Sequence, residues 1–313
     1  MIKLSIIVPV YNHEKYIEQA IRSILQQKVK FNYEVIIGED CSKDKSKDIL
    51  KCLEKECPSN FQFYYREKNM GARRNIRDLY SRMCGEYFIV LEGDDYWIDS
   101  EKLQKQVDFL DSNKEYIACA HRVKVVDKDS NELHVKYPEC EKREYSIFDY
   151  ENLTFPGQTS TVMSRNYITY DLFDTSLLNV KYYAGDQRKY FMLAANGRVY
   201  CFPNYWSAYR YNNMSGDSFS AKIHESIDIY QQDIAFRKAL IKYSIKIGNS
   251  DARKVAEALY ILSVYGYVKY AHLESGNQIL YDEFVHCKYK VHIVLFLIKF
   301  FWNHKIKKSY DRL

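Results

Sequence analysis

The sequence is short of the residues that mark loop-rich, fibrous and secreted proteins. Its 313 residues include only 11 Gly and 5 Pro, and no heptad pattern persists, which excludes a collagen-like chain, a coiled coil and a low-complexity tail. The 8 Cys include no C-x-x-C pair, so reduced thiols are expected rather than a zinc site or a disulfide framework. The first residues show no secretory signal pattern. These absences predict a globular protein of the cytoplasm.

Positive charge is concentrated in residues 286–313. The formal net charge is +5, but this segment carries seven Lys or Arg against one Asp, so the rest of the chain is nearly neutral. A neutral body disfavours nucleic-acid binding, because phosphates need a basic surface. Residues 291–302 within the segment are mostly apolar. They are too few to span a bilayer, which needs about 20 residues. The segment is predicted either to lie on a membrane surface as an interfacial helix or to dock on the body of the protein.

Strands and helices are predicted to alternate along the first third of the chain. Apolar runs predict strands at 4–10, 33–38, 61–65 and 86–91, and helical spacing predicts helices at 14–27, 46–56, 71–84 and 101–113. This order is typical of a Rossmann-like, mostly parallel sheet with helices on both faces, in which ligands bind beyond the carboxyl ends of the strands. Further strands are expected at 117–126 and 160–163, and residues 132–156 are expected to be largely loop. Residues 225–246 and 251–270 are predicted to be helical, with a boundary near Gly216 and Asp217.

Acidic side chains stand where two of the predicted strands end. Glu39 and Asp40 follow the second strand, and Glu92, Asp94 and Asp95 follow the fourth. Acids at the ends of apolar strands repel one another, so a shared cation or a hydrogen-bond donor of a ligand would explain them. Such oxygen ligands suit Mg²⁺ or Mn²⁺ rather than zinc, and the ion would hold a diphosphate.

A structural explanation for the second acidic group competes with this one. An Asp pair after a strand is more often a helix cap or part of a turn. Asp99 is better placed to cap the helix that follows, which leaves Asp94 and Asp95 without a structural role. Gly93 would let the backbone turn sharply enough to aim both carboxylates at one point. The order of the elements together with the acids therefore favours a functional site.

Four segments together resemble family 2 glycosyltransferases with the GT-A fold. They are residues 5–12 (SIIVPVYN), residues 35–40 (VIIGED) with Ser42 and Asp44, residues 69–71 with Arg74 and Asn75, and residues 85–95 (GEYFIVLEGDD). The resemblance implies an α/β fold of the GT-A type with a helical C-terminal extension. It assigns residues 1–216 to a catalytic domain, with a nucleotide-binding half (1–115) and an acceptor half (116–216), and residues 217–313 to a helical region with a basic tail.

The resemblance also implies roles for particular residues. The nucleotide of the donor would be held by Pro9, Tyr11, Asn12, Asp40 and Arg74, with the Asp40 carboxylate accepting from the N–H of uracil. Asp94 and Asp95 would bind the divalent cation, and Asp94 also the diphosphate. Glu92 stands where the family has Asp, and its longer side chain is not expected to reach the metal.

Two residues of the second half are assigned in the same way. Asp186 precedes a helix predicted at 187–195 and would act as the catalytic base; the competing explanation is an N-cap. Asn212 stands where the family often has His. His121 and Arg122 are candidates for an acceptor pocket, but a plain surface role is the stronger expectation.

The implied activity is inverting transfer of a sugar from a nucleotide diphosphate, a UDP-sugar, to a hydroxyl of a glycan or a lipid-linked acceptor. It would depend on Mn²⁺ or Mg²⁺ and serve surface polysaccharide biosynthesis at the cytoplasmic face of a membrane. One alternative is a catalytically silent sugar-nucleotide-binding protein. Another is a nucleotidyltransferase, which would carry a Gly-rich loop after the first strand, whereas residues 10–15 (VYNHEK) contain no Gly.

Overall fold

The chain forms two compact units in a computed structural model, which describes residues 1–135, 142–152, 156–166, 177, 180, 185–211 and 226–310. The first unit comprises Met1–Tyr145, Phe155–Asp171 and Asn196–Ala221. The second comprises Ser146–Thr154, Leu172–Ala195 and Lys222–Leu313. The boundary predicted near Gly216 and Asp217 lies outside the described residues.

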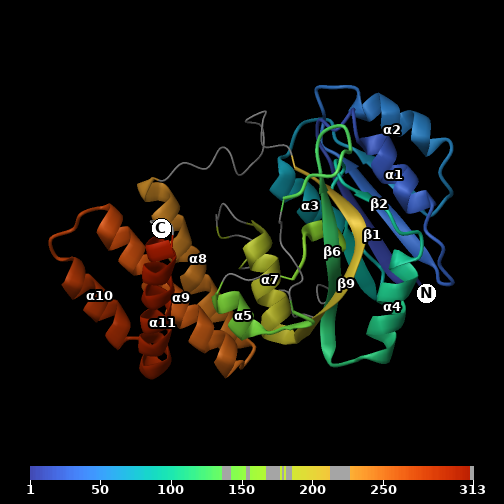
Figure 1. The fold of residues 1–313 in the computed structure, drawn as a ribbon. Coiled ribbons are helices and arrows are strands. Elements are labelled where there is room, and N and C mark those ends of the chain that lie inside the picture. The colour runs from blue at the N-terminus through green and yellow to red at the C-terminus, as the bar shows by residue number, and fades with distance from the viewer. Residues whose placement is uncertain are drawn as a thin grey trace. The chain divides into compact units, whose positions relative to one another are not determined.

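The first unit is built on a 9-stranded sheet in the order β3-β2-β1-β4-β8-β6-β9-β5, with β7 paired to β9 (Figure 1). Parallel ladders join β1 to β2, β1 to β4, β2 to β3 and β6 to β9, and the other pairs are antiparallel. The mostly parallel sheet is therefore confirmed. The strands are β1 (Leu4–Val10), β2 (Tyr33–Glu39), β3 (Phe61–Tyr65), β4 (Tyr87–Val90), β5 (Tyr96–Trp97), β6 (Tyr116–Val126), β7 (Glu144–Tyr145), β8 (Met163–Arg165) and β9 (Arg198–Arg210).

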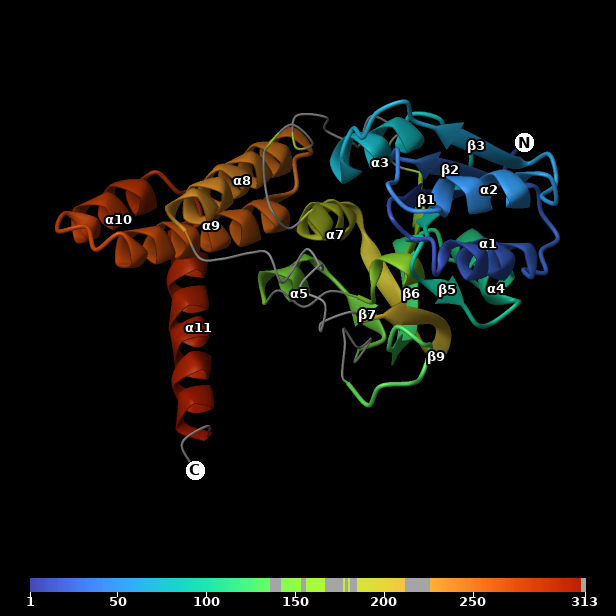
Figure 2. The same cartoon turned by 90° about the horizontal axis from the view of Figure 1, so that it is seen from above.

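Helices cover both faces of this sheet, as Figure 2 shows. They are α1 (Ile17–Leu25), α2 (Ser46–Glu54), α3 (Ala72–Tyr80) and α4 (Lys102–Ser112). Alternate residues of β1, such as Leu4 and Ile6, join one buried core with residues of α1, α2 and α4. On the opposite face the ring of Tyr80 in α3 lies 5.6 Å from that of Phe88 in β4. The alternation of strands and helices along the sequence thus becomes a layered arrangement with the strand ends open to ligands.

The sequence pattern did not predict β9, whose 13 residues include Pro203. Proline argues against a strand because it cannot donate a ladder hydrogen bond. In the structure, Pro203 falls in a register shift of the β6–β9 ladder, between the paired residues Phe202 and Tyr205, so the strand tolerates it. Cys201 in the same strand is disulfide-bonded, whereas reduced thiols were expected throughout. The strand expected at 160–163 is also corrected: a 3-10 turn, η1 (Thr159–Thr161), precedes β8.

The described part of the second unit is helical, which confirms the predicted helical C-terminal region. Its helices are α5 (Ile147–Glu151), α7 (Gly185–Asn196), α8 (Ile227–Lys246), α9 (Ser250–Tyr270), α10 (Gly276–Val285) and α11 (Lys290–Tyr310). Two of them begin at capping side chains, because Ser226 accepts from the Ile229 N–H and Asn249 from the Asp251 N–H. None of the helices in the described residues combines the length and the apolar character that crossing a bilayer requires.

Candidate functional site

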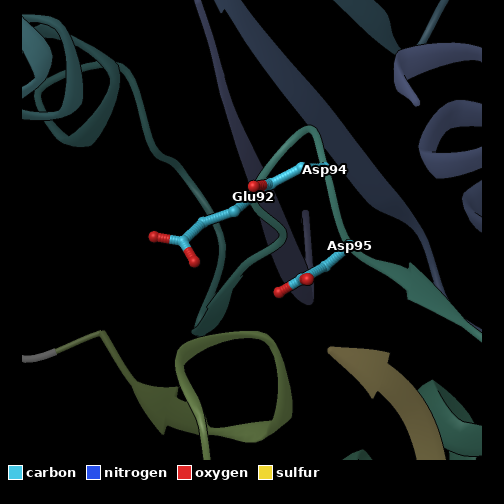
Figure 3. Close-up of side chains that lie close together, drawn as sticks. All are labelled: Glu92, Asp94 and Asp95. Atoms are coloured by element: carbon cyan, nitrogen blue, oxygen red, sulfur yellow. The ribbon is translucent and has the colours of Figure 1, made fainter. Parts of the chain in front are cut away.

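Three carboxylates lie together in the turn after β4. Glu92, Asp94 and Asp95 each place a carboxylate oxygen within 4.8 Å of the others (Figure 3). The turn leaves the carboxyl end of β4, beside its parallel neighbour β1, which is the edge where ligands bind in such sheets. The structure therefore brings Asp94 and Asp95 together as the sequence predicted. It also adds Glu92, which was not expected to reach.

Gly93 is needed in this turn because of its neighbours. Its φ is not in the left-handed region, so the sharp turn expected of it does not require a glycine. A Cβ at this position would lie 2.5 Å from Nδ1 of His13 and 3.2 Å from the Cδ1 of Ile17. The acidic turn is thus packed directly against the segment that follows β1. A larger residue would force either the His13 side chain or the acidic turn to shift.

Asp95 is the buried member of the acidic cluster, with 1% of its surface exposed. Its Oδ1 accepts from the Arg210 N–H at 2.9 Å, and its Oδ2 accepts from Nε2 of Gln158 at 2.8 Å. Burial, followed by repulsion from Asp94 and Glu92, holds the pKa of the Asp95 carboxyl well above its usual range. A cation between the three carboxylates would offset both effects, because it favours the charged form of Asp95.

The Arg210 side chain fixes the acidic turn to the rest of the first unit. Only 4% of this residue is exposed. Its Nε donates to the carbonyl oxygen of Asp94 at 3.0 Å, Nη1 to that of Asp127 at 2.9 Å, and Nη2 to Oε1 of Gln19 at 2.8 Å. The guanidinium also lies 4.3 Å from the ring centre of Tyr16. Because its donors point in three directions, one residue at the end of β9 joins α1, the acidic turn and the turn after β6.

Gln158 connects the acidic cluster to η1. Its Nε2 donates to Asp95 and lies 3.4 Å from Oε2 of Glu92, while its Oε1 accepts from the N–H of Ser160 at 2.7 Å. η1 is itself held by Nε1 of Trp97, which donates to the Ser160 carbonyl at 3.1 Å. Nothing in the sequence singled out Gln158 or Arg210. Both act through contacts between residues far apart in the chain.

The residues after β1 form a second part of this edge. Pro9 is half-buried, and Tyr11 is 37% exposed. Asn12 has a left-handed φ of 58°, which Asn tolerates better than most residues. Its N–H donates to Oγ of Ser42 at 3.0 Å, and its Oδ1 accepts from the Lys43 N–H at 2.9 Å. Asn12 thus joins the ends of β1 and β2, beside the exposed Tyr11 ring.

Two buried acids follow each other at the end of β2. Oδ1 of Asp40 accepts from the Met70 N–H at 2.7 Å, and Oδ2 from the Gly71 N–H at 2.9 Å, so this carboxylate holds the loop before α3. Oε1 of Glu39 accepts from the Ser42 N–H at 2.6 Å. Its buried Oε2 has no hydrogen-bond partner among the described residues. Because an unpaired buried oxygen is costly, Glu39 is a candidate ligand-binding residue. The sequence pattern placed it beside Asp40 at the strand end but indicated no role for it.

Arg74 lies exposed in the first turn of α3. The next residue, Asn75, is buried, and its Nδ2 donates to the carbonyl oxygen of Gly38 at 2.8 Å. This bond fastens α3 to the end of β2. The two residues therefore divide their roles: Asn75 positions the helix, and Arg74 presents a charge to solvent beside the Asp40 loop.

Asp186 belongs to the second unit, where it lies exposed in the first turn of α7. The helix begins at Gly185, two residues earlier than predicted, so Asp186 is inside the first turn rather than at the cap. Its Oδ1 accepts from the Gln187 N–H at 2.9 Å. The buried Arg237 donates to Oε1 of Gln187 at 3.1 Å and to the Tyr150 hydroxyl at 3.2 Å, which holds this end of α7. The base role of Asp186 stays a prediction.

The other candidates have simpler outcomes. Asn212 lies outside the described residues. His121 is fully buried, its Nδ1 lies 2.7 Å from the Arg122 carbonyl oxygen, and burial holds its pKa well below its usual range. A buried neutral imidazole of this kind is part of the core and not of the molecular surface, which corrects the surface role expected for it.

Comparison with known proteins places the chain in a family. A family model described as glycosyl transferase family 2 matches residues 5–170, more than half of the chain. An uncharacterised protein of Mycobacterium tuberculosis (strain ATCC 25618 / H37Rv) is 31% identical over 207 residues, which cover 66% of this chain and 58% of that protein. The poly(ribitol-phosphate) beta-N-acetylglucosaminyltransferase TarS of Staphylococcus aureus (strain MW2) is 32% identical over 115 residues, 36% of this chain and 20% of TarS. The chain thus spans little more than half the length of the first of these relatives.

Solved structures show the same fold. The crystal structure of S. aureus TarS 1–349 in complex with UDP-GlcNAc has a TM-score of 0.61 at 18% identity and covers 88% of this chain and 75% of its own. The mannosyltransferase PcManGT from Pyrobaculum calidifontis, in complex with GDP-Man and Mn²⁺, has a TM-score of 0.52 at 13% identity, with coverages of 96% and 87%. These likenesses confirm the predicted α/β fold of the GT-A type.

Proposed function

This chain belongs to glycosyl transferase family 2, and from that premise we propose that it is an inverting glycosyltransferase that uses a UDP-sugar. The acceptor group is a hydroxyl of a glycan or of a lipid-linked saccharide. One observation carries the proposal: three carboxylates gather at the carboxyl edge of the parallel sheet, beside the exposed residues that follow β1. Such a group of acids fits a cation that would hold the diphosphate of the donor.

The acidic cluster fits a divalent cation, Mn²⁺ or Mg²⁺. Its donors are carboxylate oxygens alone, which suit these ions better than zinc. Asp94 and Glu92 offer the more accessible oxygens, because both oxygens of Asp95 already accept hydrogen bonds from the protein. When bound, the ion supplies Lewis-acid stabilisation of the charge that develops on the departing diphosphate. Arg210 and Gln158 keep the carboxylates in place for it.

The nucleotide of the donor would lie over the ends of β1 and β2, against Pro9, Tyr11 and Asn12. In this proposal Asp40 accepts from the N–H of the base, and each of its oxygens retains a lone pair for that bond. Glu39 is a second acceptor at the same strand end, supported by its unpaired buried oxygen. Arg74, exposed at the start of α3, would attract the phosphates.

Asp186 would take the proton of the attacking hydroxyl. Replacing it by Asn should abolish turnover while Mn²⁺-dependent binding of UDP, measured by calorimetry, stays unchanged. Asp228→Asn is a matched control, because Asp228 is another exposed acid in the first turn of a helix in the second unit. Full turnover in Asp186→Asn would remove Asp186 from the mechanism.

The donor sugar and the pathway are proposed by analogy with relatives. TarS is named for transfer of N-acetylglucosamine to poly(ribitol-phosphate) and has been crystallised with UDP-GlcNAc, which supports UDP-GlcNAc as the first donor to test. We propose a role in surface polysaccharide biosynthesis in the cytoplasm, with residues 286–313 making peripheral contact with the membrane.

Turnover of labelled donors tests the proposal. We expect one UDP-sugar of a panel to be transferred, or slowly hydrolysed, only in the presence of Mn²⁺ or Mg²⁺. Asp94→Ala should remove the response to the metal, because Asp94 presents a ligand oxygen at the open side of the cluster. Mn²⁺-dependent binding without any turnover across the panel would favour a silent binding protein, and release of pyrophosphate would favour a nucleotidyltransferase.

A further inference from the structure

α11 is apolar on two sides, and the second unit covers only one of them. The side toward α9 includes Ile293 and Phe296, which are 0% and 6% exposed. The ring of Phe301 lies 5.2 Å from that of Tyr265 in α9. The other side is exposed between residues 291 and 302. Figure 2 shows α11 extending away from α9. We call this side the outer stripe; it consists of Val291, Val294, Leu295, Ile298 and Trp302.

The outer stripe is a continuous surface. Counted from Val291, its members fall at i, i+3, i+4, i+7 and i+11, so they share one helix face. Trp302 is 67% exposed, Leu295 62% and Ile298 61%. Beside the stripe, apolar side chains of α9, α10 and α11, such as Leu280, Phe284 and Leu297, line an open cavity of about 260 Å³. Soluble proteins seldom leave an apolar surface of this extent facing water, which indicates a binding surface.

The charges around the outer stripe indicate which class of partner binds it. α11 contains no Asp or Glu, and Lys288 and Lys299 are exposed near its apolar residues. Three further lysines follow in the sequence, at 305, 307 and 308. Two copies of the chain pairing through this face would bring like charges together. An anionic surface with an apolar interior matches both features, and that combination is a bilayer containing acidic lipids.

The length of the apolar segment decides how the helix meets such a bilayer. Residues 291–302 rise by about 18 Å in a helix, well short of the hydrocarbon core of about 30 Å. The helix can therefore lie in the headgroup region with its lysines at the phosphates, but it cannot cross.

We propose that the outer stripe of α11 is a docking surface for an anionic lipid bilayer. The inference deepens the peripheral contact included in the proposed function and rests on it. It adds the residues that enter the lipid, the orientation of α11 along the surface and the requirement for acidic lipids.

Trp302 provides a direct test. The chain has 3 Trp, and the other two, Trp97 and Trp206, are 3% and 6% exposed, so a change of emission on binding reports on Trp302. We expect vesicles of phosphatidylcholine with phosphatidylglycerol to float the full chain and shift its emission to the blue. Phosphatidylcholine alone should do so weakly, and high salt should reduce both signals. Trp302→Phe should still float but lose the shift.

Matched variants separate lipid binding from folding. Leu295→Gln with Ile298→Gln should lower the floated fraction about tenfold at limiting lipid, because two exposed apolar side chains no longer enter the bilayer. Ile245→Gln is the control, since Ile245 is a 51% exposed residue of α8 outside the stripe. All three residues are exposed, so the melting temperature should not change.

Three results would overturn the inference: no flotation with acidic lipid, equal flotation of the double variant, or a dimer in solution that the double variant dissolves. Binding of UDP and Mn²⁺ is measured without vesicles. If the chain did not bind UDP and Mn²⁺ but still floated with acidic vesicles, the proposed glycosyltransferase function would be refuted and the docking surface would be retained.

Discussion

Replacing Arg210 by Met removes the guanidinium that fixes the acidic turn and keeps a side chain of similar length. The carbonyl oxygen of Asp94 and Oε1 of Gln19 then lose this donor, whereas the carbonyl oxygen of Asp127 keeps the Ser130 N–H. The backbone bond from Arg210 N to Asp95 remains, because it does not involve the side chain.

The expected loss of stability follows from burial and bond count. A hydrogen bond from a charged donor contributes about 1.5–3 kcal/mol, but bonds that share one residue are not additive. With 4% of Arg210 exposed, we expect the variant to lose about 3–5 kcal/mol of unfolding free energy. At about 2–4 °C per kcal/mol for a unit of this size, the melting temperature falls by about 6–20 °C.

Arg198, at the other end of β9, supplies the control. It pairs with Glu144 at 3.0 Å, and its side chain is 50% exposed, so Arg198→Met should cost no more than about 1 kcal/mol. Urea unfolding measures the stability of both variants, and calorimetry measures their affinity for Mn²⁺ with UDP. We expect Arg210→Met to weaken that affinity at least about tenfold at a temperature where the variant is folded, and Arg198→Met to leave it unchanged.

Arg210→Lys refines the test, because Lys keeps the charge but has one nitrogen, which cannot reach the partners that Nε, Nη1 and Nη2 of Arg210 bond. It should recover part of the stability and little of the metal affinity. If Arg210→Met proved as stable as the wild type and bound Mn²⁺ and UDP equally well, Arg210 would not be what holds the acidic turn.

Two further predictions concern the same turn. Gly93→Ala should lower the free energy of unfolding by about 1–3 kcal/mol and weaken metal binding, because its Cβ would lie 2.5 Å from Nδ1 of His13. Adding His13→Ala should restore part of both, as measured by urea unfolding and Mn²⁺ titration. A Gly93→Ala variant with unchanged stability and metal affinity would contradict this packing. Without metal, stability should fall as the pH rises above the ordinary pKa of Asp towards neutrality, because burial and the neighbouring acids raise the native pKa of Asp95 and its ionisation then opposes folding. Adding Mn²⁺, or replacing Asp95 by Asn, should reduce this decrease of stability with pH. If stability depended on pH equally in Asp95→Asn, another group would be responsible.

The sequence predicted the parts of this protein that are encoded locally. Short segments of about a dozen residues predicted each of β1, β2, α1 and α2 from their apolar runs or helical spacing. This is possible because burial of one face imposes a period on the side chains. Their order implies a parallel sheet, and a parallel sheet gathers its carboxyl ends at one edge. The order of the elements together with the acids at the strand ends therefore predicted a site with Asp94 and Asp95, and the family resemblance added the residues after β1.

The tertiary structure decided how that site is completed. Glu92 joins the cluster, and Gln158, 63 residues from Asp95 in the sequence, donates to its carboxylate. Arg210, 115 residues from Asp95, donates to it from the end of β9, a strand that was not predicted because it contains a proline. No local period marks such partners, since a buried carboxylate or carbonyl oxygen takes whichever donor the packing brings within 3 Å or so. The outer stripe of α11 is a similar case: composition showed an apolar and basic helix, but only the packing on α9 determined which of its two faces is left for something else.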